Sequence, residues 1–350
     1  MEQAEAGREQ RVYRAKGGPW QVGYQLGRMA GPRLEAKIAH YIANGPGKRG
    51  LVDWERLRRS TLDWLGTLSP RFQEEIAGLA EGAGLPLQRA AEWCYVDECV
   101  PGGCSAFMGS VGGRLWLARN NDMWVPDLWG YATIREVEGC LPTLTFGLGP
   151  EPFTGTGINR ERLWLHYNYL TAWDAPSGRK PVQAPYVFLT TALETCRTLA
   201  EVEALLRGGE RTAGMMVFAV DGKDDSCAIY ECDCTTHEKR EAREDWLVGT
   251  NHWHAHPAVV DGEHGDGSRR RYERIVALLR AAAPEMGERD LPWALVRVLA
   301  DPEVEARGED SGTVYANVVC PGTGEVWYTL GGYPAASQGN WQRLEWPWGL

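Results

Sequence analysis

The order of helical and strand-like patterns predicts an α+β protein built from layers of helices and sheets. Apolar residues recur at helical spacing over residues 19–42 and 69–98, and short runs of β-favouring residues follow from residue 104 onward. A helical pattern returns around 188–207 and again over 268–300, between further strand-like runs. Because these patterns come in groups and no nucleotide-binding glycine motif follows a strand, we expect a layered sandwich and not a doubly wound parallel sheet.

The first third of the chain is predicted to be helical. The segment 19–42 is interrupted by AGPR, and the segment 69–98 is broken by EGAGLP into two helices. Ser69 is placed to cap the first of these two, with Pro70 in its first turn. The region near residue 103 lacks a flexible polar run, so we expect a change of layer within a single domain, 1–350, and not a linker.

Strands are predicted from Cys104 onward. The first group comprises the runs CSAFMGS, RLWLARN, YATIREV, TLTFGL and RLWLHYNYL. After the helix at 188–207, the second group comprises GMMVFAVDG, CAIYECD and DWLVGTNHW. Helices over 268–283 and 291–300 precede a final pair of strands, GTVYANVVCP and EVWYTLGG, which we expect to form a hairpin across GTG.

Composition excludes several classes of partner. The formal net charge of −10 disfavours nucleic acid, and the short basic runs RLRR and SRRRYER are interpreted as solvated helix faces. No apolar run approaches the roughly 18 residues of a membrane span, and the polar N-terminus contains no apolar core of a signal peptide. Nine scattered cysteines are therefore expected to be free thiols in a cytoplasmic protein. Homo-oligomerisation stays open.

The stretch VPGGCSAFMGS around Cys104 is the first candidate for chemistry. A lone cysteine is most often a structural thiol, but Gly103 directly before it permits close approach to its carbonyl group. Arg119 and Asp122 stand at the end of the next predicted strand, so a hairpin would return a cation and a carboxylate to the thiol. A cation favours the thiolate, and a carboxylate can orient an amine.

A second candidate is the segment VGTNHWHAH. Asn251 could supply an amide N–H to a developing oxyanion, although a turn asparagine at a strand end is the plainer interpretation. His252, His254 and His256 would share one face of an extended strand and could bind a metal, but Pro257 indicates that the strand ends earlier. A papain-like pairing of Cys104 with a histidine also stays open, without that family's local signature.

The remaining thiols offer a further metal-binding alternative. Cys227, Cys232, Cys234 and His237 lie within one short segment, and cysteines also recur at positions 94, 99 and 104. Neither group has the paired C-x2-C spacing of zinc ribbons, so core or surface thiols are the favoured interpretation. No G-x-S-x-G elbow of a serine hydrolase is present.

Taken in order, several segments resemble the acyl-coenzyme A:6-aminopenicillanic acid acyltransferase family of N-terminal nucleophile (Ntn) hydrolases, which is related to choloylglycine hydrolases. The matching segments are PWQVGYQLGRMAG, EEIAGLAEGAGLPLQRA, GGCSAF, LARNNDM, GTGINRERLWLHYNYL and GTNHW. They span about 20 to 335, and EEIAGLAEGAGLPLQRA is the most specific. The chain departs from the pattern at Arg160 and Arg162, where small residues and glycine are usual, and at Trp253, where phenylalanine is usual.

The resemblance implies a four-layer αββα sandwich and a precursor that cleaves itself at the Gly103–Cys104 bond. Residues 1–103 would form a helical pro-segment or α subunit, and residues 104–350 a β subunit beginning at the nucleophile. The freed α-amino group of Cys104 would act as the general base for its own thiol. In this scheme Asp122 orients the amine, Arg119 holds the carboxylate or biases the thiol, and Asn251 donates to the oxyanion.

The expected activity is therefore cleavage or exchange of an amide bond through a thioester on Cys104. The substrate is a small-molecule amide or acyl thioester, and no cofactor or metal is expected. Asn168, Trp124 and Trp129 are the candidate substrate-binding residues, the tryptophans because an aromatic lining suits an apolar acyl group. The alternatives are an uncleaved ligand-binding homologue with an inert Cys104, or a metal-binding protein using the 227–237 thiols or the 252–256 histidines.

Overall fold

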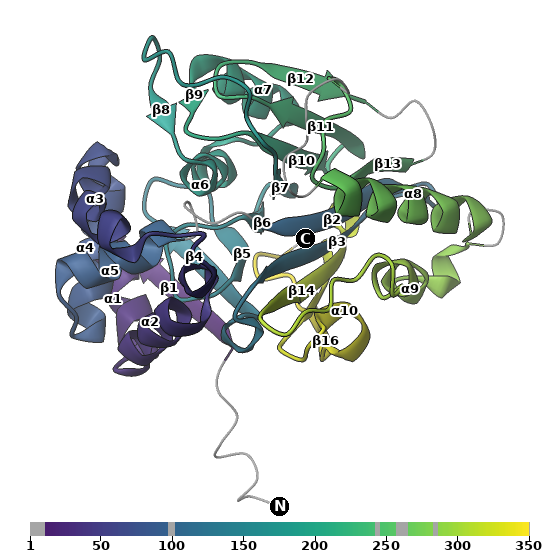
Figure 1. The fold of residues 1–350 in the computed structure, drawn as a ribbon. Coiled ribbons are helices and arrows are strands. Elements are labelled where there is room, and N and C mark those ends of the chain that lie inside the picture. The colour runs from purple at the N-terminus through teal and green to yellow at the C-terminus, as the bar shows by residue number, and fades with distance from the viewer. Residues whose placement is uncertain (1–10, 97–101, 242–245, 257–264, 283–285, 350) are drawn as a thin grey trace, which may run out of the picture.

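The computed structural model describes residues 11–96, 102–241, 246–256, 265–282 and 286–349, and its strands form two large sheets (Figure 1). The first sheet has eight strands in the order β1 (Val12–Gly17), β4 (Tyr131–Val137), β5 (Thr143–Gly147), β6 (Thr156–Asn159), β7 (Leu163–Tyr169), β10 (Met215–Asp221), β11 (Ser226–Cys232) and β12 (His237–Arg240). The second has six strands in the order β13 (Trp246–Gly249), β2 (Gly103–Val111), β3 (Arg114–Trp124), β14 (Ser311–Cys320), β15 (Glu325–Thr329) and β16 (Trp341–Leu344). A small parallel pair comprises β8 (Val182–Gln183) and β9 (Glu210–Arg211).

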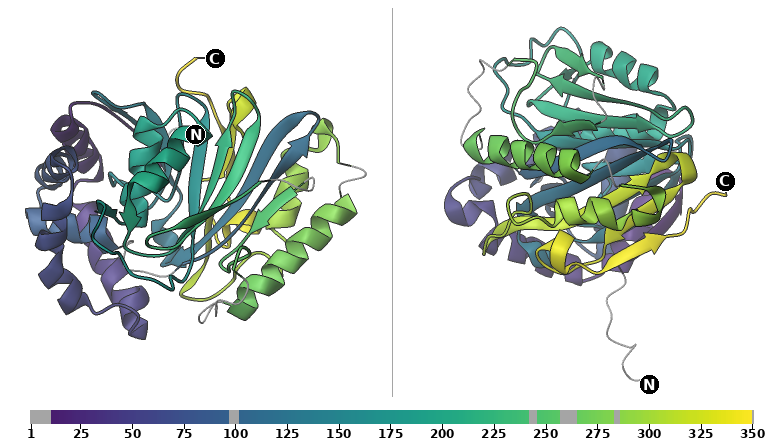
Figure 2. Two further views of the ribbon diagram at one scale, coloured as in Figure 1. Left: turned by 90° about the horizontal axis from the view of Figure 1, so that it is seen from above. Right: turned by 90° about the vertical axis from the view of Figure 1, so that its right-hand side faces the viewer.

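Helices pack on the outer sides of both large sheets (Figure 2). The eight-stranded sheet is contacted by α1 (Pro19–Ala30), α6 (Pro185–Thr195) and α7 (Leu199–Gly208). The six-stranded sheet is contacted by α8 (Gly265–Ala282), α9 (Trp293–Leu299) and the short α10 (Ala335–Gln338). The N-terminal helical layer is completed by α2 (Arg33–Asn44), α3 (Trp54–Thr67), α4 (Pro70–Ala83) and α5 (Leu87–Val96). The predicted mixed α+β class is confirmed.

Two apolar cores follow from this arrangement. One combines the inner faces of the sheets with the N-terminal helices and includes the buried side chains of Met108, Leu117 and Trp164. The other lies between the six-stranded sheet and α8–α9 and includes Phe107, Ile275 and Leu295. Because successive side chains of a strand point to opposite faces, β2 supplies Met108 to one core and Phe107 to the other.

Most predicted elements are present, with three differences. The predicted strand DWLVGTNHW ends at Gly249, so Asn251 and the residues after it lie in a bend and not in a strand. Ser69 precedes α4, but its side chain makes no capping hydrogen bond, and Pro70 alone marks the helix start. The segment before Cys104 is not wholly helical, because β1 pairs in parallel with β4, an interaction too distant in sequence for local patterns to predict.

The glycine-rich EEIAGLAEGAG motif is explained by the contact between α1 and α4. Gly23 and Gly27 of α1 face Gly78 and Gly82 of α4, so the two backbones approach closely. A Cβ atom built on Gly78 would lie 2.1 Å from the Trp20 carbonyl oxygen, and one on Gly23 would lie 1.9 Å from the Glu75 carbonyl oxygen. The four-residue spacing of the glycines therefore has a packing role, because it places them on one face of each helix.

Gly78→Ala is expected to destabilise the fold by about 3 kcal/mol or more, because the added methyl group meets rigid backbone and the helices must move apart. Gly66→Ala is the matched control: Gly66 lies in α3 with open space around it, and alanine there should stabilise the helix slightly. Denaturant unfolding of both variants measures the difference, and equal stabilities would contradict the proposed backbone contact.

A buried charged group fastens the N-terminal helices to the eight-stranded sheet. The Arg135 guanidinium on β4 donates to both carboxylate oxygens of Glu75 on α4, at 2.5 and 2.7 Å, and lies 3.1 Å from the Glu194 carboxylate on α6. Arg71 on α4 also pairs with Glu194. Buried charges are stabilised by pairing with opposite charges. Because Glu75 precedes residue 103 while Arg135 and Glu194 follow it, these ion pairs connect the two parts of the chain.

Candidate active site

The hairpin formed by β2 and β3 brings the predicted site residues together. In its register Gly103 lies opposite Asp122, and Cys104 lies opposite Asn121. The Cys104 side chain is buried, and Gly103 is where β2 begins. The pairing confirms the sequence-based inference that a hairpin returns Arg119 and Asp122 to the thiol.

Arg119 is a buried cation directly beside the thiol. Its Nη2 lies 3.5 Å from Cys104 Sγ and also donates to Asn121 Oδ1 at 2.7 Å and to the Tyr167 carbonyl at 3.0 Å. Its Nη1 donates to the Gly155 carbonyl at 2.9 Å and to the Thr156 hydroxyl. The carbonyl, amide and hydroxyl oxygens that accept from Arg119 are all neutral. A thiolate at Sγ would therefore supply the negative charge that balances the buried guanidinium group.

The environment of the thiol has two opposing effects on its ionisation. Burial raises the pKa of the Cys104 thiol, and the Arg119 cation acts in the opposite direction. The net direction is upward, so the thiol is protonated in this uncleaved chain. A nucleophilic Cys104 therefore needs a base to remove its proton.

Asn251 contacts the main chain of the nucleophile. Its Oδ1 accepts the Cys104 backbone N–H at 2.9 Å, and its Nδ2 donates to the Tyr169 carbonyl at 3.0 Å. The Asn251 backbone N–H donates to the buried Ser268 hydroxyl at 2.7 Å. The side chain is thus fixed at the nitrogen that a cleavage before Cys104 would release as an amine.

Asp122 is held by two further side chains. The Thr313 hydroxyl on β14 donates to its Oδ1 at 2.6 Å, and Arg271 Nη1 on α8 lies 3.2 Å from its Oδ2. Burial raises the pKa of the Asp122 carboxyl, whereas Arg271 and then Thr313 favour its ionised form. A Cβ atom on Gly103 would lie 3.2 Å from Asp122 Oδ2, so glycine leaves room for this carboxylate at the predicted scissile bond.

Arg271 is a functional candidate that the sequence interpretation missed. Its Nη2 donates to Asn251 Oδ1 at 2.8 Å while its Nη1 pairs with Asp122, so it connects both predicted site residues. It belongs to SRRRYER, so the interpretation of that run as a solvated helix face is wrong at this position. Helical spacing offered a signal, because Ser268, Ile275 and Leu279 form the buried stripe of α8 and Arg271 lies one turn after Ser268.

Arg271→Met is expected to move the acidic limb of the pH–rate profile to higher pH. Removing the cation takes away the largest interaction that opposes burial, so the pKa of Asp122 rises further and a higher pH is needed to ionise the carboxyl. The measurement is kcat/KM against pH. Arg274→Met is the matched control, because Arg274 on the same helix pairs with Asp301 at 2.6 Å. Superimposable profiles of the Arg271 variant and wild type would contradict this role for Asp122.

The three predicted substrate-binding residues have different surroundings. Asn168 is buried and donates to the Thr250 carbonyl at 3.0 Å, directly before Asn251. Trp129 is buried against Tyr315 and donates its indole N–H to the Trp124 carbonyl at 2.7 Å. Trp124 is partly exposed at the end of β3, with Arg49 over its ring. Trp129 is thus part of the core, while Trp124 retains accessible surface.

An exposed aromatic residue near Asn251 was also missed. Trp173 is 43% exposed, and its ring centroid lies 4.2 Å from that of Trp253 and 4.8 Å from that of His256. The segment carrying it runs beside the Asn251 segment, because Trp253 Nε1 donates to the Thr171 carbonyl at 2.9 Å. Asp233 Oδ1 accepts the Trp173 backbone N–H at 3.2 Å, which holds the main chain at this residue.

The metal-binding alternatives receive little support. Among the described residues, one group of potential ligands lies close together, Asp174, Asp233 and Cys234, with ligand atoms within 4.8 Å of one another. Both carboxylates already accept backbone N–H groups, from Cys234 and Thr235, so hydrogen bonding within the protein accounts for them. The three histidines of the described segment 252–256 do not form such a group.

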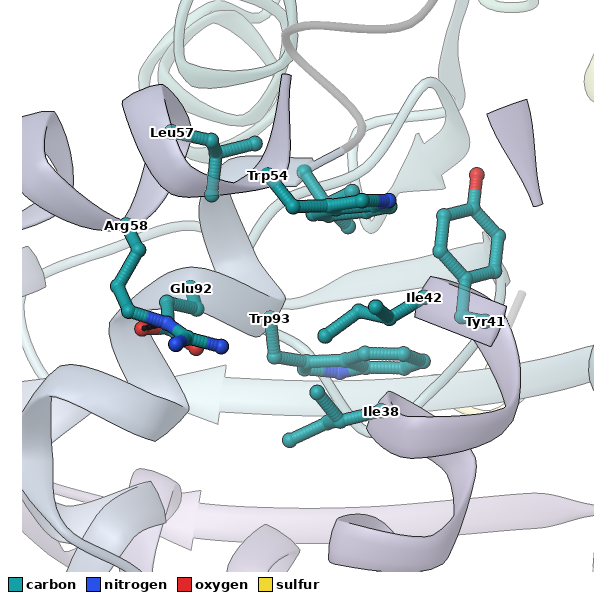
Figure 3. Close-up of a pocket in the computed structure, with 9 residues that line it drawn as sticks. Ile38, Tyr41, Ile42, Trp54, Leu57, Arg58, Glu92 and Trp93 are labelled. Atoms are coloured by element: carbon teal, nitrogen blue, oxygen red, sulfur yellow. Dashed lines mark ion pairs between the residues drawn. The ribbon is translucent and has the colours of Figure 1, made fainter. Parts of the chain in front are cut away.

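A separate small pocket lies between α2, α3 and α5 (Figure 3). The indoles of Trp54 and Trp93 lie on either side of Ile42, and the Arg58–Glu92 ion pair, 3.3 Å apart, stands at one end. Its free volume of about 10 Å³ is room for about one water molecule. This pocket is therefore a packing gap among the N-terminal helices and not a substrate site.

Comparison with known proteins gives a likeness of fold. No protein-family model and no curated protein matches the sequence. A penicillin V acylase from Agrobacterium tumefaciens has a TM-score of 0.50 at 14% identity, covering 69% of this chain and 86% of that chain. A mutant conjugated bile acid hydrolase from Clostridium perfringens has a TM-score of 0.46 at 13% identity, covering 70% of this chain and 97% of that chain.

A third solved structure, a Caenorhabditis elegans N-acylethanolamine-hydrolyzing acid amidase ortholog, has a TM-score of 0.46 at 14% identity, covering 69% of this chain and 100% of that chain. At these identities the likeness concerns the fold, so residue roles have to be argued from the site itself. No helix in the described part of the chain combines the length and apolar composition of a membrane span.

Proposed function

We propose that this protein is a cysteine Ntn amidohydrolase or acyltransferase that acts through a thioester on Cys104. The observation that carries the proposal is the pair of contacts on one residue: Asn251 holds the Cys104 backbone nitrogen at 2.9 Å, and Arg119 lies 3.5 Å from its sulfur. A structural thiol needs neither contact. The two packed sheets with outer helices, shared in fold with the penicillin V acylase, support a four-layer αββα sandwich.

The first reaction in this proposal is self-cleavage. The Cys104 thiol attacks the Gly103 carbonyl carbon, and the carbon–nitrogen bond breaks as the acyl group moves from nitrogen to sulfur. The thiol proton passes to the Cys104 nitrogen, which becomes the free α-amine. Water then hydrolyses the thioester, which releases a Gly103 carboxylate and the free thiol. The glycine at position 103 suits this step, because a side chain there would crowd Asp122 and Arg271.

The second reaction is turnover of an external amide. The α-amine, held by Asn251 Oδ1, accepts the thiol proton. It thereby acts as the base that Cys104 requires, because burial raises the pKa of this thiol. The sulfur bonds to the substrate carbonyl carbon, and the resulting ammonium returns the proton to the departing amine. Water or another amine then takes the acyl group, so the same intermediate serves hydrolysis and transfer.

The pieces 1–103 and 104–350 would remain one body after cleavage. The first piece supplies β1 to the eight-stranded sheet, where it pairs with β4 of the second piece. It also supplies Glu75, whose partner Arg135 belongs to the second piece. We propose that the chain stays a single domain of two subunits, and that it belongs with the acyl-coenzyme A:6-aminopenicillanic acid acyltransferase family.

We propose that the substrate carries an apolar or aromatic group that reaches Trp173. Trp173→Ala should raise KM about tenfold for an amide with a phenylacetyl group while leaving an acetyl amide of the same amine unchanged. Trp293→Ala is the matched control, since Trp293 is 45% exposed on α9 and packs on Trp327. Equal effects of Trp173→Ala on both amides would remove Trp173 from substrate recognition.

Intact-mass analysis of purified protein tests self-cleavage. The proposal predicts two masses, matching 1–103 and 104–350, for the wild type and one full-length mass for Cys104→Ala. A single uncleaved wild-type chain that still turns over amides would contradict the amine as base. A chain that neither cleaves nor turns over amides would support an uncleaved ligand-binding protein, and stoichiometric zinc by elemental analysis would support the metal-binding alternative.

A further inference from the structure

Asn121 presents an amide group to the Cys104 thiol that the proposed reactions leave without a role. The two residues lie directly opposite each other on β2 and β3, so their side chains leave the sheet on the same face. The Asn121 side chain is 3% exposed, and its Nδ2 is buried with no hydrogen-bond partner among the described residues. A buried unpaired N–H donor is unfavourable and needs an explanation.

The orientation of this amide is determined by its neighbour. Arg119 Nη2 lies 2.7 Å from one end of the Asn121 side chain, and a guanidinium can only donate, so that end is the oxygen. The same oxygen lies 3.6 Å from Cys104 Sγ. The amide nitrogen is therefore the other end, and its two hydrogens are directed away from the oxygen that accepts from Arg119.

The side-chain N–H groups of Asn251 and Asn168, the two asparagines predicted for the site, already donate hydrogen bonds within the protein. Asn251 Nδ2 donates to the Tyr169 carbonyl at 3.0 Å, and Asn168 Nδ2 donates to the Thr250 carbonyl at 3.0 Å. Arg119 Nε is a second buried donor without a partner in the described structure, next to the same thiol. Asn121 and Arg119 therefore each contact Sγ and each carry a buried donor that no described group uses. Such donors stabilise the charge that develops during attack on a carbonyl group.

We propose that Asn121 Nδ2 is an oxyanion donor for the amide cleavage, a role that rests on the proposed function. As the sulfur–carbon bond forms, the carbonyl π electron pair moves to oxygen, and the Asn121 amide donates to that oxygen. As the tetrahedral intermediate collapses, the electron pair returns, the carbon–nitrogen bond breaks, and the Cys104 ammonium gives its proton to the departing amine. Asn121 is thus a catalytic residue, and Asn251 positions the Cys104 amine.

Asn121→Ala tests this role, and Asn120→Ala is its matched control. Asn120 is the adjacent buried asparagine, and its side chain donates to the Leu299 carbonyl at 2.9 Å on the other face of β3. The Asn121 variant should lose about 10²-fold or more in kcat with KM little changed. The Asn120 variant should retain kcat. Asn121→Asp, which keeps the acceptor for Arg119 and removes the donor, should also lose kcat if the alanine variant does not fold.

Phenylacetaldehyde, which has the skeleton of the phenylacetyl group, is the probe that separates this inference from the proposed function. Addition of the Cys104 thiol to the aldehyde places an oxygen where the oxyanion would form, so Asn121→Ala should weaken aldehyde binding about as much as it lowers kcat/KM. Unchanged aldehyde affinity and unchanged kcat in a folded Asn121→Ala protein would overturn the inference. A wild-type protein that turns over no amide would instead overturn the proposed function, while aldehyde binding would still measure the Asn121 contribution.

Discussion

Cys104→Ala is expected to abolish amide turnover, with a loss of at least about 10⁴-fold in kcat, because the proposed acyl-enzyme forms on this thiol, which lies beside the Arg119 cation. The variant should fold normally, since removing one sulfur atom from a small buried side chain leaves only a small cavity. Steady-state hydrolysis of a chromogenic amide, with thermal unfolding measured alongside, provides the test.

Cys196→Ala is the matched control for this variant. Cys104 and Cys196 are each 4% exposed, but Cys196 lies at the end of α6, where its sulfur contacts the Thr195 hydroxyl at 3.8 Å. Its replacement should leave kcat unchanged. Residual activity of Cys104→Ala within tenfold of the wild type would mean that the reaction does not pass through this thiol.

Asn251→Ala is expected to lower kcat by about 10² to 10³-fold, because the Cys104 amine would lose the acceptor that orients it as general base. The fold should persist, since the Asn251 main chain is still held by the Ser268 hydroxyl. The same variant should slow self-cleavage, since Asn251 also holds the backbone nitrogen at the proposed scissile bond.

Asn159→Ala separates this effect from the general loss of a buried asparagine. Asn159 is also buried and donates to the Leu193 and Cys196 carbonyls, at 2.9 and 2.8 Å, away from the thiol. Its replacement should lower the melting temperature without lowering kcat. If Asn251→Ala and Asn159→Ala had the same kinetic parameters, Asn251 would have only a structural role.

Local sequence patterns predicted the parts of the site that lie within one hairpin. The glycines before Cys104 and the strand ending at Asp122 are close in sequence, and antiparallel pairing of neighbouring strands is the simplest arrangement for them. The order of helices and strands likewise indicated the α+β class. Asp122, Arg119 and Asn251 all lie around Cys104, although the role of each stays a prediction.

Residues that join the site from distant elements were not predictable in this way. Arg271 reaches Asp122 and Asn251 only because α8 packs across β2 and β13, and Thr313 arrives from β14. Trp173 depends on the path of a loop that follows β7. Asn121 was visible in the sequence, yet the role proposed for it depends on a side-chain nitrogen without a partner in the described part of the chain, which only the three-dimensional structure reveals.

Trapping the acyl-enzyme tests the central claim most directly. Wild-type protein mixed with an activated aryl ester, for which acylation is faster than deacylation, is quenched in acid and analysed by peptide mass spectrometry. The account predicts an acyl mass on the thiol of a peptide whose first residue is Cys104. An acyl group on any other residue, or turnover of the ester while Cys104 stays unmodified at every quench time, would contradict it.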